Sequence, residues 1–161
     1  MEWWEERFLL DAAKMEKLYW NCIREAASGY HLTPNEISVL LFLRRYAPES
    51  DTATEMVRQL GISKALVARS VDCLYRRGFV QGERDANDRR IVHLHLCGKG
   101  VAIAQRLYQS GCPVVEQLRR DVSEEELQQV HEIMQKMQRN LDEILSNMES
   151  TVYKGLHRVT V

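Results

Sequence analysis

The spacing of hydrophobic residues changes along the chain and divides it into segments with different expected structures. Residues 8–26 repeat hydrophobic side chains every three or four positions, which is typical of an amphipathic helix. Helical spacing returns in residues 34–47, 53–60 and 64–77, and then in 98–122, with a disturbance at 111–113, and from 124 onward. Residues 79–84 and 90–96 instead alternate around a turn at 85–88, which predicts a β-hairpin.

Side-chain caps mark the expected helix starts. In three places a Ser or Thr precedes a helical segment and a Glu follows three positions later, which is the spacing of a capping box. These pairs are Thr33 with Glu36, Thr52 with Glu55, and Ser123 with Glu126. Ser63 is expected to cap the helix that starts at Lys64, and Gly61 to end the helix before it. Two helices joined by a tight turn predict a helix-turn-helix, and the hairpin that follows is in the position of a wing.

Charge is distributed unevenly along a chain that is almost neutral as a whole. The 161 residues include 22 Lys+Arg and 23 Asp+Glu, for a formal net charge of −1. Residues 44–99, which contain the predicted helix-turn-helix and hairpin, carry 11 basic and 7 acidic residues, a net charge of +4. A basic central segment between acidic flanks favours a surface that faces a polyanion.

Several classes of protein are not favoured. The four cysteines, Cys22, Cys73, Cys97 and Cys112, form no Cys-x-x-Cys pair, so no zinc knuckle or thioredoxin-like motif is expected. The first residues are acidic where a secretory signal is basic, and no hydrophobic run is long enough to span a membrane, so we expect a cytoplasmic protein. No phosphate-binding loop, hydrolase elbow or metalloprotease motif is present, so we expect neither an enzyme nor a bound cofactor or metal.

The hairpin turn carries the first candidate chemistry. In the stretch RDANDRRIVHLHL, Arg84, Arg89 and Arg90 lie close to Asp85 and Asp88. An arginine at the tip of a thin hairpin fits the DNA minor groove, where negative potential is concentrated. The aspartates can accept hydrogen bonds from the turn backbone and hold an arginine in position. The alternative interpretation is a solvated charged turn that binds nothing.

The second helix of the helix-turn-helix carries the other candidate chemistry. Its N-terminal turn offers Lys64 and Arg69 for phosphates or guanine, and small Ala65 and Ala68 for close approach. Such a helix enters the major groove at its N-terminal end. The expected buried face consists of Val67, Val71 and Leu74. A helix-turn-helix used only for packing is the alternative.

The order of elements and three sequence motifs resemble the MarR family of winged-helix transcription regulators. The similar segments lie between about Leu32 and Gly100 and read LTPNEISVLLFL, TATEMVRQLGISKALVARSVDCLYRRGFV and RDANDRRIVHLHLCGKG. The most specific motif is the Asp-x-Arg of the wing, Asp88 and Arg90. The resemblance implies a mainly α fold with a small β-hairpin wing: an N-terminal dimerisation helix (1–31), a winged helix-turn-helix DNA-binding lobe (32–100), and C-terminal dimerisation helices and tail (101–161).

The resemblance also implies a function. Members of the family are usually ligand-responsive repressors, which bind a pseudo-palindromic double-stranded operator as homodimers and release it when a small, often aromatic, molecule binds. The implied DNA contacts are Ser63, Lys64, Ala65, Leu66, Ala68, Arg69, Asp88, Arg89 and Arg90. The family commonly has Thr where Leu66 and Ala68 stand here, so contact with thymine methyl groups is expected to replace hydrogen bonds. Cys97 similarly stands where a Thr normally caps the following helix.

Three further features have competing interpretations. His93 and His95 share a strand face and could reach one metal ion, but two ligands do not make a site, so we expect a solvent-facing strand. Cys22 is a candidate redox sensor, although we expect a buried core thiol. A thiol-based regulator and a winged-helix module that binds only protein therefore remain the alternative functions.

Two segments are left without an assignment. The aromatic or ring-bearing residues near the junction of the first two helices are equally suited to an effector cleft and to the core; they are Trp20, Tyr30, His31 and Tyr46. Residues 150–161 have some strand character, but we place them in no element.

Overall fold

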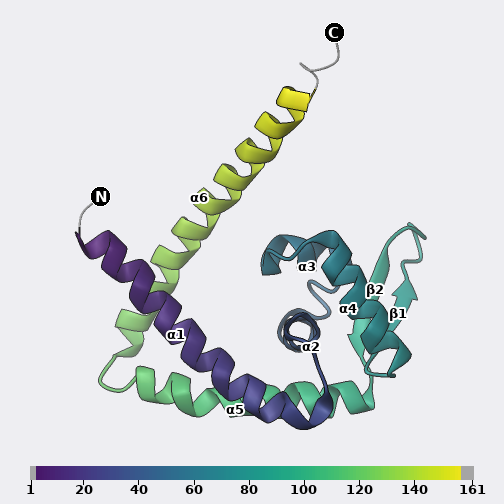
Figure 1. Ribbon diagram of the computed structural model, residues 1–161, viewed down its shortest axis with the longest axis horizontal. Coiled ribbons are helices and arrows are strands. Elements are labelled where there is room, and N and C mark those ends of the chain that lie inside the picture. Colours follow the sequence, from purple (N-terminus) through teal and green to yellow (C-terminus); the bar gives the residue numbers. More distant parts are fainter. Residues whose placement is uncertain (1–2, 157–161) are drawn as a thin grey trace. The chain divides into compact units, whose positions relative to one another are not determined.

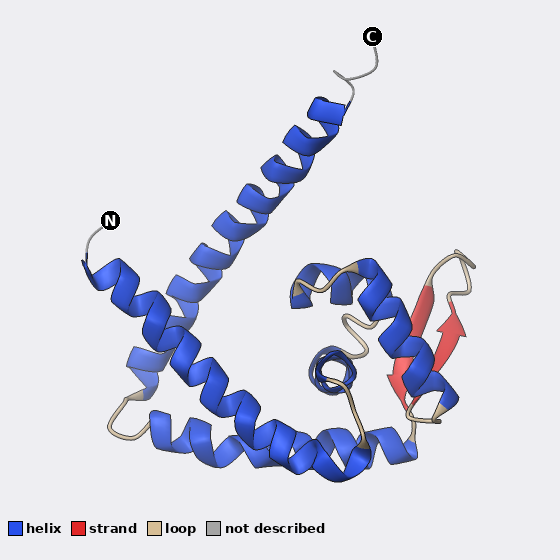
Figure 2. Ribbon diagram, in the orientation of Figure 1, coloured by secondary structure: helices blue, strands red, loops and turns tan. Residues whose placement is uncertain are grey.

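The structure, a computed structural model, describes the backbone of residues 3–156 and the side chains of residues 7–145 and 147. The elements in chain order are α1 (Trp3–Ala27), the 3₁₀ helix η1 (Ser28–Tyr30), α2 (Pro34–Tyr46), α3 (Ala53–Leu60), α4 (Lys64–Arg76), β1 (Val80–Arg84), β2 (Val92–Leu96), α5 (Gly98–Leu118) and α6 (Glu124–Leu156) (Figure 1). The chain forms two compact units, Met1–Leu118 and Arg119–Val161. The mainly α fold with one small hairpin agrees with the prediction (Figure 2).

The core of the first unit joins elements from its whole length. α1 packs along α5, and α2 packs against α3, α4, α5 and β2. Fully buried side chains come from each of these layers, including Ile23 of α1, Leu40 of α2, Leu74 of α4 and Leu107 of α5. Burial of this apolar area, at roughly 25 cal/mol per Å², is what holds α4 and the hairpin on the helical base.

The predicted capping boxes form at all three helices. At α2, Glu36 N–H donates to Thr33 Oγ1 and Thr33 N–H donates to Glu36 Oε2. Thr52 and Glu55 make the same pair of bonds at α3, and Ser123 and Glu126 make them at α6. Each box satisfies N–H groups that a helix start otherwise leaves unpaired, which fixes where the helix begins.

The turn between α3 and α4 also follows the prediction. Gly61 ends α3 with φ of 63° in the left-handed region, where glycine carries no steric penalty. Ser63 then caps α4, because its hydroxyl accepts the N–H of Leu66. The two helices and this tight turn form the helix-turn-helix.

β1 and β2 form an antiparallel hairpin, which we call the wing together with its loop, residues 85–91. Val80 lies opposite Leu96, and Arg84 lies opposite Val92. β2 begins at Val92, two residues later than predicted. Val92 is exposed while Leu94 is buried, so only the base of the wing contacts the core.

The C-terminal helices differ from the prediction in their extent. The helix α5 continues through residues 111–113 with Pro113 inside it, and it ends at Leu118 rather than 122. Gly111 is buried at the packing surface with Tyr19 of α1. In the second unit, α6 continues to Leu156, so residues 150–156 are helical and not strand-like, while 157–161 lie outside the described residues.

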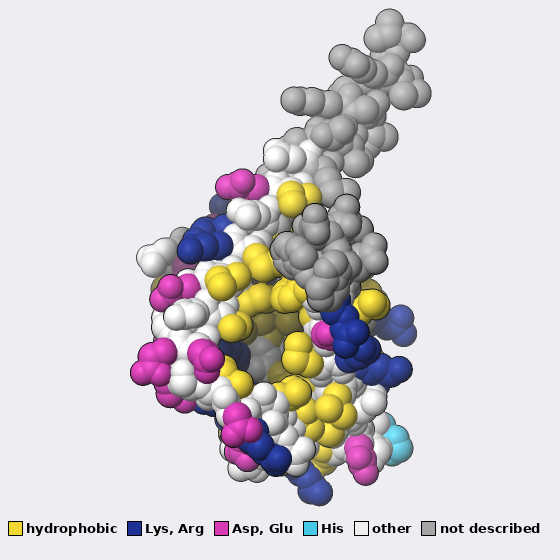
Figure 3. Space-filling model, turned by 90° about the vertical axis from the view of Figure 1, so that its left-hand side faces the viewer, with side chains coloured by type: hydrophobic (Ala, Val, Ile, Leu, Met, Phe, Trp, Pro, Cys, Tyr) yellow, Lys and Arg dark blue, Asp and Glu magenta, His cyan; other side chains and the backbone are white. Residues whose placement is uncertain are grey.

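Both α1 and α6 carry large hydrophobic side chains that reach the surface. Yellow side chains in Figure 3 mark hydrophobic residues at the surface among charged ones. The exposed residues of α1 are Phe8, Leu9, Leu10, Met15 and Leu18, and those of α6 include Val130, Ile133, Met134, Met137, Leu141, Ile144 and Leu145. Among the described residues, no helix has the length and apolar character needed to cross a membrane.

Candidate nucleic-acid interface

The N-terminal half of α4 presents the predicted contact residues on one exposed surface. Ser63, Lys64, Ala65, Leu66, Ala68 and Arg69 are all exposed. Val67 and Leu74 are buried on the opposite side and Val71 is partly buried, as predicted. Leu66 is 43% exposed and places an apolar side chain among these polar ones. The helix therefore offers basic, small and apolar side chains at one place, where a duplex could be contacted.

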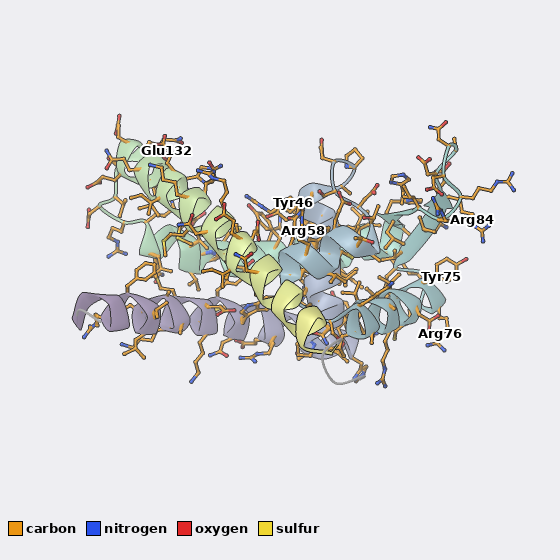
Figure 4. The ribbon with its side chains drawn as sticks, turned by 90° about the horizontal axis from the view of Figure 1, so that it is seen from above. Tyr46, Arg58, Tyr75, Arg76, Arg84 and Glu132 are labelled. Atoms are coloured by element: carbon orange, nitrogen blue, oxygen red, sulfur yellow. The ribbon has the colours of Figure 1, made fainter. Side chains whose placement is uncertain are left out.

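The last turns of α4 contain two further exposed residues, Tyr75 and Arg76. Tyr75 is 58% exposed, and Arg76 forms an ion pair with Asp72 at 2.6 Å. Both side chains point away from the body of the protein, on the helix that lies beside the wing (Figure 4). An exposed tyrosine on a helix with a buried apolar stripe is the signal that could have identified this position.

Asp85 organises the wing loop. Its Oδ1 accepts the backbone N–H groups of Asn87 and Asp88, both at 2.8 Å. The loop closes through Asp85 N–H to Ile91 O and Ile91 N–H to Asp88 O. These bonds from Asp88 and Asn87, followed by the contact with His93, lower the pKa of Asp85. The carboxylate is therefore ionised, and it acts as a built-in acceptor for the turn backbone.

Asp88 holds Arg90 through three hydrogen bonds. Asp88 Oδ1 accepts both the backbone N–H and the Nε–H of Arg90, and Oδ2 accepts Nη2–H at 2.9 Å. These hydrogen bonds lower the pKa of Asp88 and raise that of Arg90. The Arg90 side chain is nevertheless 90% exposed. The Asp-x-Arg motif thus fixes the guanidinium while leaving it open to a ligand.

Arg84 and Arg89 complete the basic surface of the wing. Both are exposed, and Arg84 is the last residue of β1 (Figure 4). Asp85 and Asp88 therefore form hydrogen bonds within the loop, while the arginine side chains lie at its surface. This arrangement fits the interpretation that the acids shape the turn and the arginines face a polyanion.

The prediction that His93 and His95 face solvent is confirmed for His95, whereas His93 is partly exposed and also contacts two carboxylates. His95 is exposed and lies 3.4 Å from Gln81 Oε1. His93 instead lies between two carboxylates, with Nδ1 at 2.6 Å from Asp51 Oδ1 and Nε2 at 3.3 Å from Asp85 Oδ2. The contacts with Asp51 and then Asp85 raise the pKa of His93. The sequence did not reveal this arrangement because Asp51 is 42 positions away.

The cysteines are free and partly exposed. Cys22 is partly buried, so the prediction of a buried core thiol was wrong; its neighbour Ile23 is fully buried in the core. Cys73 lies against the Glu36 carboxylate, and its hydrogen bond with Glu36 raises the pKa of the thiol. Among the described side chains, no group of three or more His, Cys, Asp or Glu residues is arranged to hold a metal ion.

A cavity of about 350 Å³ lies in the first unit between α1, α2 and the turn after α3. Trp20 and Arg24 line it from α1, together with Ser38 of α2. Of the four residues considered for an effector cleft, Trp20 lines this cavity, while Tyr30 and His31 line two other shallow ones and Tyr46 is partly exposed. The cavity combines the aromatic ring of Trp20 with one cationic and one acidic group, Arg24 and Glu16.

Sequence comparison identifies relatives of the central segment. A sequence profile described as "MarR family" matches residues 30–91. The transcriptional regulator AdcR of Streptococcus pneumoniae serotype 2 (strain D39 / NCTC 7466) is 29% identical over 90 residues. That match covers 56% of this chain and 57% of AdcR, so it spans little more than half of the relative's length.

Solved structures share the fold over most of the chain. A MarR-family regulator from Silicibacter pomeroyi superposes with a TM-score of 0.68 at 20% identity, covering 84% of this chain and 88% of that one. MepR of S. aureus, solved as a DNA complex, gives 0.61 at 18% identity, with 85% and 97% covered. BpsR of Bordetella bronchiseptica, whose DNA binding is regulated by 6-hydroxynicotinic acid, gives 0.59 at 18%, with 81% and 98% covered.

The profile match, the curated relative and the winged helix-turn-helix fold agree with the Asp-x-Arg motif and the capping boxes of the lobe. Residues 30–91 of the chain therefore match the MarR family, and the chain shares its fold with a regulator of that family.

Proposed function

We propose that the protein is a sequence-specific, double-stranded DNA-binding transcriptional regulator and not an enzyme. The observation that carries this proposal is the wing, where an exposed Arg90 is fixed by Asp88, beside an exposed recognition surface on α4. Arg90, with Arg89, would enter the minor groove, and Lys64 and Arg69 would contact the major groove or its phosphates. The surface of α4 that approaches the DNA most closely would be lined by Ser63, Ala65, Leu66 and Ala68. MepR supports this proposal because it has the same fold and was solved bound to DNA.

We also propose that the protein acts as a homodimer held by its terminal helices, residues 1–31 and 101–161. The exposed hydrophobic side chains of α1 and α6 support it, because apolar surfaces of this extent are usually covered in a stable protein. Sedimentation at micromolar concentration should show one species of twice the 18.8 kDa chain mass. A soluble monomer under those conditions would exclude the dimer. Two symmetric lobes would read half-sites about 10 bp apart, centre to centre, in a pseudo-palindrome.

A small aromatic molecule is the proposed effector: the protein would repress while it is bound to DNA, and binding of the effector would release the DNA. The cavity beside Trp20 and Arg24 supports this step, as does BpsR, a protein of this fold regulated by an aromatic acid. Screening aromatic acids and phenols by thermal shift should find a compound that stabilises the protein and weakens DNA binding. If the carboxylate of an aromatic acid contacts the guanidinium of Arg24, Arg24→Ala should weaken the binding of that acid.

Arg90→Ala gives the direct test of DNA binding. The operator is first selected from a random duplex pool, and affinity is then measured at several salt concentrations. Affinity should fall, and the slope of log affinity against log salt should become shallower by about one unit, since one phosphate or groove contact is lost. Lys17→Ala is the matched control, because Lys17 is an exposed cation on α1, outside the lobe. Equal losses in both variants would mean that only overall charge matters.

Asp88→Ala separates the proposed role of the acidic residues from simple repulsion. Removal of a negative charge near DNA favours binding on electrostatic grounds alone. Because Asp88 holds both the backbone and the guanidinium of Arg90, we expect the opposite, weaker binding. Tighter binding by Asp88→Ala than by the parent protein would refute the role of Asp88 as organiser.

A further inference from the structure

His93 occupies the point where the wing meets the helix-turn-helix. Its ring lies between Asp51, in the segment that leads into α3, and Asp85, the first residue of the wing loop. The backbone joins the same two segments, because Leu94 N–H donates to Asp51 O and Thr52 pairs with His93 as an isolated antiparallel bridge. Asp51 is only 8% exposed, so one side of this contact is anchored in the body of the lobe.

The protonation state of the ring decides whether both contacts are hydrogen bonds. Each ring nitrogen faces a carboxylate oxygen, and an ionised carboxylate can only accept. Only the imidazolium has two N–H donors, so only the protonated ring can bind Asp51 and Asp85 together. A neutral ring keeps one donor. The shorter contact with the more buried Asp51 is the one it retains, so Nε2 then presents a lone pair to Asp85.

Asp85 transmits this difference to the arginine. Its other oxygen accepts the N–H groups of Asn87 and Asp88, and Asp88 in turn binds the guanidinium of Arg90. A continuous series of side-chain and backbone hydrogen bonds therefore runs from the start of α3 through His93 to Arg90. Lone-pair repulsion at Nε2 would disturb the carboxylate on which the whole loop is built.

We propose that His93 is a positioning residue for Arg90, and that DNA binding weakens when its imidazolium loses its proton. This inference rests on the proposed DNA-binding function. His93 itself need not touch DNA, because it acts through Asp85 and the loop.

The acidic groups around His93 favour the protonated ring. Asp51 and Asp85 contact it, and Glu83 of β1 lies opposite it in the strand register. Glu55 of α3 is nearby in sequence to Asp51, but its carboxylate accepts the N–H groups of Asp51 and Thr52. His95, the next residue on this strand face, lies near the uncharged Gln81.

The sign of the pH dependence follows from these neighbours. The pKa of His93 is raised by Asp51 first and Asp85 second, whereas that of Asp85 is lowered. The bridge is therefore complete below the ordinary histidine pKa of about 6.5 and is lost as pH rises through the higher pKa of the folded protein. Asp85 remains ionised throughout this range, so the histidine is the group that changes.

The experiment measures DNA affinity of the full chain by fluorescence anisotropy from about pH 5.5 to about pH 9 at constant salt. Ring titration of His93 is followed in parallel by NMR in the free protein. Affinity should fall with a midpoint that coincides with the His93 titration. The total fall should not exceed the loss caused by Arg90→Ala, because His93 acts only through that arginine.

Four variants separate positioning from charge. His93→Gln should bind more weakly than the protonated parent and lose the pH dependence, while the matched control His95→Gln keeps both affinity and profile. Asp85→Asn should flatten the profile, because an amide keeps an oxygen for the turn and gives the neutral ring a donor. His93→Gln should add no further loss to Arg90→Ala, since residues acting in series are not additive.

The outcomes also distinguish this inference from the proposed function. A parent protein that binds DNA with no change across the His93 titration would overturn the inference alone. Additive losses in the double variant would overturn it too, because they mean that His93 acts independently of Arg90. A parent protein that selects no duplex at any pH would overturn the proposed function, and the positioning role with it.

Discussion

Gly100→Ala should destabilise the protein strongly, although it adds a single methyl group to a helix. Gly100 lies in the first turn of α5, where this helix passes the chain segment that joins α4 to β1. A Cβ at residue 100 would lie 2.9 Å from the carbonyl carbon and 3.1 Å from Cα of Phe79, and closer still to the Phe79 oxygen. All of these atoms belong to the backbone, so no side-chain rotation can make room.

The size of the destabilisation depends on how far the Phe79 backbone must move to relieve the clash. The Phe79 carbonyl also accepts the N–H of Cys97 at 2.9 Å, so a displacement that relieves the clash weakens this hydrogen bond. Overpacking of a closed site typically costs about 1–3 kcal/mol, and a lost backbone hydrogen bond adds about 1 kcal/mol. A loss of about 3 kcal/mol in a chain of this size lowers the melting temperature by roughly 6–12 °C.

Gly98→Ala is the matched control for this experiment. It adds the same methyl group two residues earlier on the same helix, where nothing lies within 4 Å of the new Cβ. Alanine is a better helix former than glycine by up to about 1 kcal/mol, so this variant should melt at the same temperature or slightly higher. Thermal unfolding is followed by far-ultraviolet circular dichroism at one fixed protein concentration, because the proposed dimerisation would make the melting temperature depend on concentration. If both variants melt within 2 °C of each other, which corresponds to less than about 1 kcal/mol, the close approach of α5 to Phe79 is refuted.

Three further substitutions test the core, a cap and the recognition surface. Leu107→Ala should lower the free energy of unfolding by about 2–5 kcal/mol, because Leu107 is fully buried. Val101→Ala, on the exposed side of the same helix, should change it by less than about 0.5 kcal/mol. Urea unfolding measures both free energies. Thr33→Ala should cost about 1 kcal/mol in the same assay through loss of the α2 cap, and an unchanged midpoint would contradict the role of that cap. Leu66→Ala should leave stability nearly unchanged but alter which operator sequences are selected, at positions where a thymine methyl group meets the helix; an unchanged preference would remove Leu66 from the interface.

Local features of the fold could be read from the sequence, because the interactions that create them span few residues. Each capping box joins residues three positions apart, and the structure contains all three that were predicted. The alternation that predicts the wing and the helical spacing that predicts the buried face of α4 are local in the same way. The Asp88–Arg90 pair belongs to this group, since its members are two positions apart.

Features that depend on the approach of distant segments could not be read in this way. Arg77 was counted with the basic central segment, yet its guanidinium donates to the backbone oxygens of Tyr30 and His31 and lies 4.7 Å from the Phe79 ring centroid. Arg44 likewise lies over the Tyr108 ring and donates to Gln105. A net charge of +4 therefore overstates the positive charge that faces outward, because some of these cations hold the helices of the first unit together.

The acidic residues of the central segment show the same division between near and distant contacts. Asp88 acts on Arg90 across two positions, and its role was predictable from the spacing alone. Asp51 acts on the wing across 42 positions, through His93, and nothing in the local pattern distinguishes it from a solvated loop residue. The negative charge of Asp88 is paired within the protein with the guanidinium of Arg90. The cluster of opposite charges at residues 84–90 is therefore best understood as a support that positions arginines. This support depends on Asp51, which lies outside the cluster and acts on it through His93.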